Sequence, residues 1–172
     1  MIPDQYSGPV VKFSEMMHRA LIIEDSPADT SKSAAVLRKM GVEDVQSISS
    51  VAVAIESLKD IAEGRRVPPD VVILDLEFGH ESGFEVLRYW KSTSQLKDLH
   101  IIVWTIMGEL ERKVAALFHV DEVVDKMAGP GELERALRAI GRPTSPSGRR
   151  APLSGNLKRK EPTFSKNKPA KN

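Results

Sequence analysis

The chain has 172 residues, of which 41% are hydrophobic and 28% charged, with a formal net charge of +1 and no cysteine. This length allows one globular domain with extensions, and the lack of cysteine excludes disulfides, thiolate metal sites and cysteine nucleophiles. No segment approaches the roughly 20 apolar residues of a membrane span, and residues 1–18 lack the apolar run of a secretory signal. We therefore expect a cytoplasmic protein without membrane contact.

Charge is distributed unevenly along the chain. Residues 142–172 hold nine of the 25 Lys and Arg but one of the 24 acids, Glu161. This proline- and serine-containing segment buries too little apolar surface to offset its ordering entropy, so we predict a disordered basic tail. Such a tail suits non-specific contact with nucleic-acid phosphates, contact with an acidic partner, or a solubilising role. The remainder is predicted as an irregular extension at 1–18 and one domain at 19–141.

Within this domain, apolar runs rich in β-branched residues alternate with amphipathic helical patterns. Ser26 and Pro27 are typical of a helix N-terminus, and Gly41 is typical of a helix C-terminus. After the strand 70–75 we expect a glycine-containing loop. The predicted elements, in chain order, are strand 20–23, helix 27–40, strand 45–48, helix 51–62, strand 70–75, helix 84–91, strand 101–105, helix 109–118, strand 123–125 and helix 130–140.

This alternation predicts an α/β fold, a doubly wound five-stranded parallel sheet of the (βα)5 type with helices on both faces. Four predicted strands end in polar residues: Glu24 and Asp25, Asp75, Thr105, and Lys126. In an open parallel sheet, ligands bind at the carboxyl ends of the strands, so these five side chains should meet at one edge. Carboxylates, a hydroxyl and an ammonium in one place are the groups that phosphoryl transfer uses.

In order, spacing and position, these residues resemble the receiver domain of two-component response regulators of the chemotaxis-regulator type. The resemblance covers about 120 residues, from Ala20 to Gly141, and implies the flavodoxin-like strand order 2-1-3-4-5. It also implies a single-domain regulator in phosphorelay signalling. Its expected phosphodonor is a sensor histidine kinase or phosphotransfer protein, and its expected target is a downstream protein.

The resemblance also assigns roles to the acids. Asp75 is the expected phosphoacceptor, a carboxylate nucleophile that would form an acyl phosphate. Glu24, Asp25 and Asp75, with the backbone carbonyl of Glu77, are expected to hold Mg²⁺, which would offset the repulsion between the clustered carboxylates. Gly83 matches a glycine that the family carries in the loop after the phosphoacceptor.

Positions linked to signal output agree less well with the family. Lys126 is expected to pair with the phosphoryl oxygens, and Thr105 to be the switch hydroxyl that bonds the phosphate once it forms. However, Val123 stands where an aromatic switch residue is usual, and Met127 stands where a proline usually follows the lysine. Ile106 replaces the usual Ala or Gly and should narrow access to the phosphoacceptor.

We interpret the chain as a phosphorylatable receiver that signals by protein contact and not as a multiple-turnover enzyme. One alternative is a phosphorylation-independent, receiver-like adaptor whose switch has been lost. Another is a haloacid-dehalogenase-like phosphatase, since Asp75-Leu76-Glu77 superficially resembles the nucleophile and second acid of those enzymes. In those enzymes the acid pair comes last, whereas here it precedes Asp75.

Overall fold

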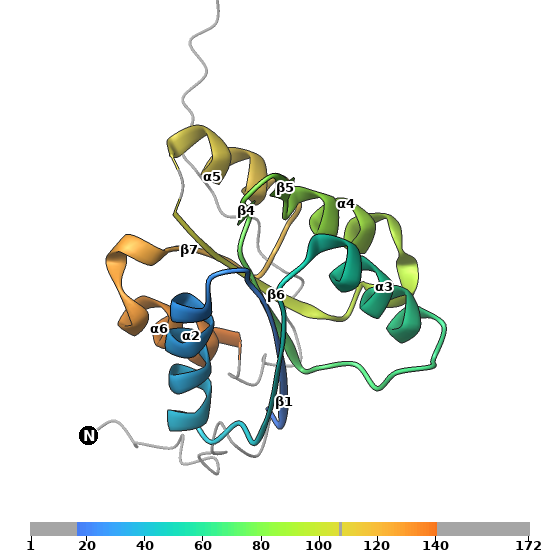
Figure 1. Cartoon of the computed structure of the whole chain (residues 1–172), viewed down its shortest axis with the longest axis horizontal. Coiled ribbons are helices and arrows are strands. Elements are labelled where there is room, and N and C mark those ends of the chain that lie inside the picture. The colour runs from blue at the N-terminus through green and yellow to red at the C-terminus, as the bar shows by residue number, and fades with distance from the viewer. Residues whose placement is uncertain (1–16, 107, 141–172) are drawn as a thin grey trace, which may run out of the picture. The chain divides into compact units, whose positions relative to one another are not determined.

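The computed structural model describes residues 17–106 and 108–140, which form a central sheet covered by helices on both faces (Figure 1). All neighbouring strands of this sheet are parallel, and their order is β2-β1-β3-β6-β7. The predicted α/β class and the strand order implied by the resemblance are confirmed. The strands are β1 (Arg19–Ile23), β2 (Asp44–Ile48), β3 (Val71–Leu74), β6 (His100–Thr105) and β7 (Glu122–Asp125).

The register of the sheet decides which side chains meet at its carboxyl edge. Ile23 pairs with Leu74, so the residues that follow them, Glu24 and Asp75, leave neighbouring strands at the same level. On the other side of β3, Leu74 pairs with Val103 of β6. Strand β7 ends level with β6, since its last residue is paired with Thr105. The edge therefore brings together the polar residues that follow the strands.

Two apolar cores form, one on each face of the sheet. Successive residues of a strand point to opposite faces, and in β6 Val103 faces one core while Trp104 faces the other. Helices α2 and α6 cover the Trp104 face, and α3, α4 and α5 cover the Val103 face (Figure 1). The helices are α2 (Pro27–Lys39), α3 (Val51–Ala62), α4 (Phe84–Ser92), α5 (Glu109–Ala116) and α6 (Pro130–Ile140).

The helix boundaries follow local chemistry. The Ser26 hydroxyl accepts a hydrogen bond from the backbone N–H of Asp29 at 3.4 Å, which caps α2 as predicted. Gly41 follows the end of α2 with φ of 90°, a conformation that glycine adopts without steric cost. Helix α5 ends at Ala116, two residues earlier than predicted. The next residues bond three positions back, as Leu117 does to the carbonyl of Val114, so the chain tightens out of the α-helical pattern.

Short elements complete the fold. The expected loop after β3 contains a small antiparallel hairpin, formed by β4 (Glu77–Phe78) and β5 (Glu81–Ser82). Two 3₁₀ turns, η1 (Ser94–Leu96) and η2 (Lys126–Ala128), precede β6 and α6. The hairpin and η2 are important here because they carry Glu77 and Lys126 next to the carboxyl edge.

The N-terminal boundary of the packed region lies slightly earlier than predicted. Met17 is buried in the core beneath α2 and α6, and the backbone N–H of His18 donates to Asp70 Oδ2 at 2.7 Å. The rest of the predicted extension and the predicted basic tail at 142–172 lie outside the described residues. Within the described part of the chain, no helix is long and apolar enough to cross a membrane.

Candidate functional site

Three carboxylates converge at the carboxyl edge of the sheet. Glu24 and Asp25 follow β1, Asp75 follows β3, and each offers an oxygen within 4.8 Å of the other two. Glu24 and Asp75 are only 3% and 5% exposed, whereas Asp25 is exposed. A compact set of carboxylate oxygens is what hard divalent cations such as Mg²⁺ prefer. The predicted set of acidic side chains is therefore assembled in a geometry that fits such an ion.

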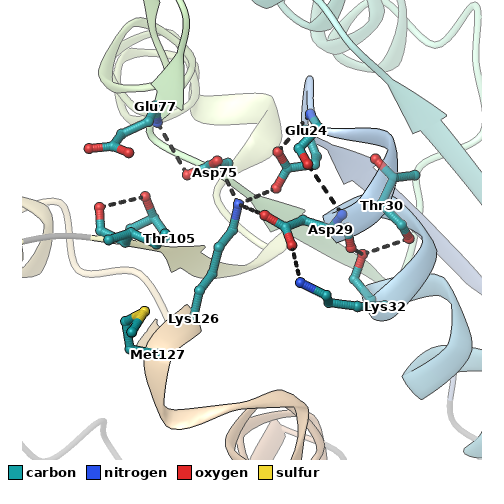
Figure 2. A network of polar contacts seen from close by, with 12 residues as sticks. Glu24, Asp29, Thr30, Lys32, Asp75, Glu77, Thr105, Lys126 and Met127 are labelled. Atoms are coloured by element: carbon teal, nitrogen blue, oxygen red, sulfur yellow. Dashed lines mark hydrogen bonds and ion pairs between the residues drawn. The ribbon is translucent and has the colours of Figure 1, made fainter.

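Lys126 lies among these acids. It begins η2 directly after β7, and its side chain is 8% exposed. Its Nζ donates to Glu24 Oε2 at 2.5 Å and to Asp75 Oδ2 at 2.7 Å, and it reaches Asp29 Oδ2 at 3.1 Å (Figure 2). These partners are 102, 51 and 97 residues away along the chain. The structure thus brings the predicted lysine onto the predicted acids.

Burial and ion pairing shift the pKa values of this cluster. Burial raises the pKa of Glu24 above its ordinary value, although the hydrogen bond from Lys126 opposes that change. Burial would lower the pKa of Lys126, but its hydrogen bonds to Asp75 and Glu24 outweigh that effect and raise the pKa. The Lys126 ammonium therefore remains protonated at neutral pH, and it supplies the positive charge beside the buried carboxylates.

Asp29 also contacts Lys126, but the sequence analysis did not predict it as a site residue. It lies in the first turn of α2, where an acid is expected simply because it interacts favourably with the helix dipole. Its Oδ1 accepts from Lys32 Nζ at 2.7 Å and its Oδ2 accepts from Lys126 Nζ. The hydrogen bond from Lys32, together with that from Lys126, holds the pKa of Asp29 below its ordinary value. The sequence feature that could have indicated Asp29 is its position four residues after the Glu24-Asp25 pair.

In Figure 2, Thr105 and Glu77 lie on the opposite side of Asp75 from Glu24 and Asp29. Thr105 is fully buried at the end of β6, and its hydroxyl contacts the carbonyl of Ile106 at 3.5 Å. That distance is long for a hydrogen bond between oxygens, so the hydroxyl is weakly held. The backbone N–H of Glu77 donates to Asp75 Oδ1 at 3.2 Å, which orients the carboxylate.

The three positions with unusual residues occupy different environments. Val123 is partly buried and packs against the core beneath α3, α4 and α5. Met127 is 78% exposed beside Lys126, and Ile106 is 49% exposed next to Thr105. Two large apolar side chains, each next in sequence to a predicted site residue, are therefore exposed.

A sequence model of the response regulator receiver domain family matches residues 20–138. The chain belongs to this family. Receiver domains serve two-component systems as phosphoacceptors, bind Mg²⁺ at an acidic pocket, and interact with histidine kinases or phosphotransfer proteins. In this receiver domain the acidic cluster is formed by Glu24, Asp25 and Asp75.

The receiver domain is similar to the phosphate regulon transcriptional regulatory protein PhoB of Pseudomonas aeruginosa, with 34% identity over 86 residues, 49% of this chain and 38% of that protein. It is 26% identical to PhoB of Escherichia coli over 132 residues, 76% of this chain and 55% of that protein. The chain thus matches about half of these relatives' length or less. The crystal structure of the Mn²⁺-bound form of response regulator Rcp1 has the same fold, with a TM-score of 0.60, 24% identity, and coverage of 72% and 91% of the two chains.

Proposed function

We propose that this receiver domain accepts a phosphoryl group on Asp75 from a phosphohistidine of a sensor histidine kinase or phosphotransfer protein. The Asp75 carboxylate attacks phosphorus, an O–P bond forms as the N–P bond breaks, and the leaving imidazole takes up a proton from solvent. The product is an acyl phosphate on Asp75. The observation that carries this proposal is the convergence of Asp75 with two further acids and Lys126 at one sheet edge.

The acids would hold the metal ion that this reaction needs. We assign Glu24, Asp25, Asp75 and the backbone carbonyl of Glu77 as ligands of Mg²⁺. When bound, the ion neutralises the carboxylates and the transferring phosphoryl group. The support is the chemistry of the donors, three carboxylate oxygens within 4.8 Å of one another at the start of two neighbouring loops.

Lys126 and Thr105 would act on the phosphoryl group itself. Lys126 Nζ already contacts Asp75 Oδ2 at 2.7 Å, so it can move onto a phosphoryl oxygen attached there and form a charge-assisted hydrogen bond. The Thr105 hydroxyl gives up only a 3.5 Å contact when it turns toward the same group. Phosphorylation would thereby pull the end of β6 and η2 toward Asp75.

We propose that output passes through protein contacts near α5 and η2. Leu117, which directly follows α5, and Met127 in η2 are 73% and 78% exposed, so each offers a large apolar side chain to a partner. Val123 stands where an aromatic switch residue is usual, so this output does not use a threonine–aromatic pair. The match to the receiver family favours a phosphoacceptor over the haloacid-dehalogenase-like phosphatase.

The test is incubation with Mg²⁺ and acetyl phosphate, followed by intact-mass analysis. We expect the wild-type protein to gain the mass of one phosphoryl group and Asp75→Asn to gain none, with an unchanged circular dichroism spectrum. Asp44→Asn, an exposed acid at the start of β2, is the matched control and should be phosphorylated normally.

Two results would contradict the proposal. Labelling of Asp75→Asn would show that another residue is the acceptor. A wild-type protein that takes up no phosphoryl group, even from several phosphorylated kinases, would favour the phosphorylation-independent adaptor.

A further inference from the structure

The Lys126 ammonium and a divalent cation would share carboxylate partners. An ammonium has three N–H donors, and the Lys126 ammonium has three carboxylate partners: Glu24, Asp75 and Asp29. Two of these partners, Glu24 and Asp75, are also members of the cluster that can hold a metal ion. A cation bound there would therefore compete with Lys126 for the negative charge of these two carboxylates.

Asp29 differs from the other two partners. Among the described residues, the acids close enough to share a metal ion are Glu24, Asp25 and Asp75, and Asp29 is not one of them. Its two oxygens are divided between two lysines, Oδ1 to Lys32 and Oδ2 to Lys126. Its Oδ2 is thus available to Lys126 whether or not the metal site is filled.

The position of Asp29 is also well fixed. Its backbone is part of the first turn of α2, and its N–H lies 3.4 Å from the Ser26 hydroxyl. Its side chain is 19% exposed, so its interaction with Lys126 is partly shielded from solvent. The ring of buried Trp104 also lies 5.5 Å from Lys126 Nζ, within cation–π range.

We propose that Asp29 is a positioning residue that, with the Trp104 ring, holds the Lys126 ammonium when Glu24 and Asp75 bind a divalent cation. This second partner lowers the free-energy cost of releasing Lys126 from the metal ligands, and it keeps the ammonium beside Asp75. The inference rests on the proposed function, because it assumes that the acidic cluster binds Mg²⁺.

The test is a Mg²⁺ titration by isothermal calorimetry on the full chain, arranged as a double-mutant cycle. We expect Asp29→Asn to weaken Mg²⁺ binding by about fivefold to tenfold, the scale of one ordinary hydrogen bond in net terms. In a Lys126→Met background, Mg²⁺ should bind more tightly than to wild type, and Asp29→Asn should change that affinity less than about twofold. Lys32→Gln is the matched control, since it removes the other partner of Asp29 and should leave Mg²⁺ affinity unchanged.

Each other outcome overturns the inference in a different way. If Asp29→Asn weakens Mg²⁺ binding equally in both backgrounds, Asp29 acts through its charge alone and not through Lys126. If it leaves wild-type affinity unchanged, Lys126 needs no second partner. A wild-type protein that binds no Mg²⁺ would instead contradict the proposed function, and the inference would fail with it.

Discussion

Lys126 offsets the negative charge of two buried acids. Glu24 and Asp75 have side chains 2% and 6% exposed, and both contact the Lys126 ammonium. Removal of one partner from a buried ion pair leaves an uncompensated charge, which typically costs about 3–5 kcal/mol. Because Asp25 at the same site is exposed, water can relieve part of that cost here.

We therefore expect Lys126→Met to lower the free energy of unfolding by about 2–4 kcal/mol in the presence of a chelator. Saturating Mg²⁺ should restore more stability to this variant than to wild type, because the ion replaces the missing positive charge and no longer competes with the ammonium. Urea unfolding with and without Mg²⁺ measures both values. Equal Mg²⁺ effects in the two proteins would show that lysine and metal do not share ligands.

At the residue scale, the candidate site was largely predictable because most of its members directly follow strands. Glu24, Asp25, Asp75 and Lys126 could be placed at one edge from the strand pattern alone. Asp29 could not, since an acid in the first turn of a helix has an ordinary local explanation. The cation–π contact with Trp104 was also beyond the sequence, because it depends on side-chain direction across two strands.

At the scale of elements, the strands and most helix ends were predicted closely, and the β4–β5 hairpin was not. Its strands are two residues long, too short for an alternating pattern to indicate them. Gly83 directly follows the hairpin, and its N–H donates to the carbonyl of Leu76 at 3.0 Å. A Cβ at Gly83 would lie 2.2 Å from the backbone oxygen of Asp75, so this glycine permits the close approach of α4 to the loop that carries Asp75.

We expect Gly83→Ala to destabilise the domain by about 1–3 kcal/mol, because the backbone around Asp75 must move to admit the methyl group. Phosphorylation by acetyl phosphate should slow in parallel. Gly131→Ala is the matched control, since a Cβ at this helical glycine meets nothing within 4 Å; it should be neutral or stabilising by up to about 1 kcal/mol. Thermal unfolding of both variants measures their stability relative to wild type. If Gly83→Ala is as stable as wild type, the backbone at Gly83 does not need the close approach described above.

At the scale of the whole molecule, the site links the strands on which both cores are built. Strands β1 and β3 are adjacent and buried on both faces, and the acids that follow them repel one another unless a cation lies between them. Metal binding at this edge would therefore stabilise the native domain, because in the unfolded chain Asp75 is not held beside Glu24 and Asp25.

Mg²⁺ should accordingly raise the free energy of unfolding of the whole domain, by about 2.7 kcal/mol at a free concentration one hundred times the dissociation constant. The increase should appear as a shift of one cooperative transition, and a chelator should reverse it. Because any salt screens repulsion between carboxylates, sodium chloride at equal ionic strength is the control and should give a much smaller shift. Asp75→Asn, which lacks one charged ligand, should also respond less than wild type. An equal response to both salts would mean that the acidic edge is merely screened and binds no ion.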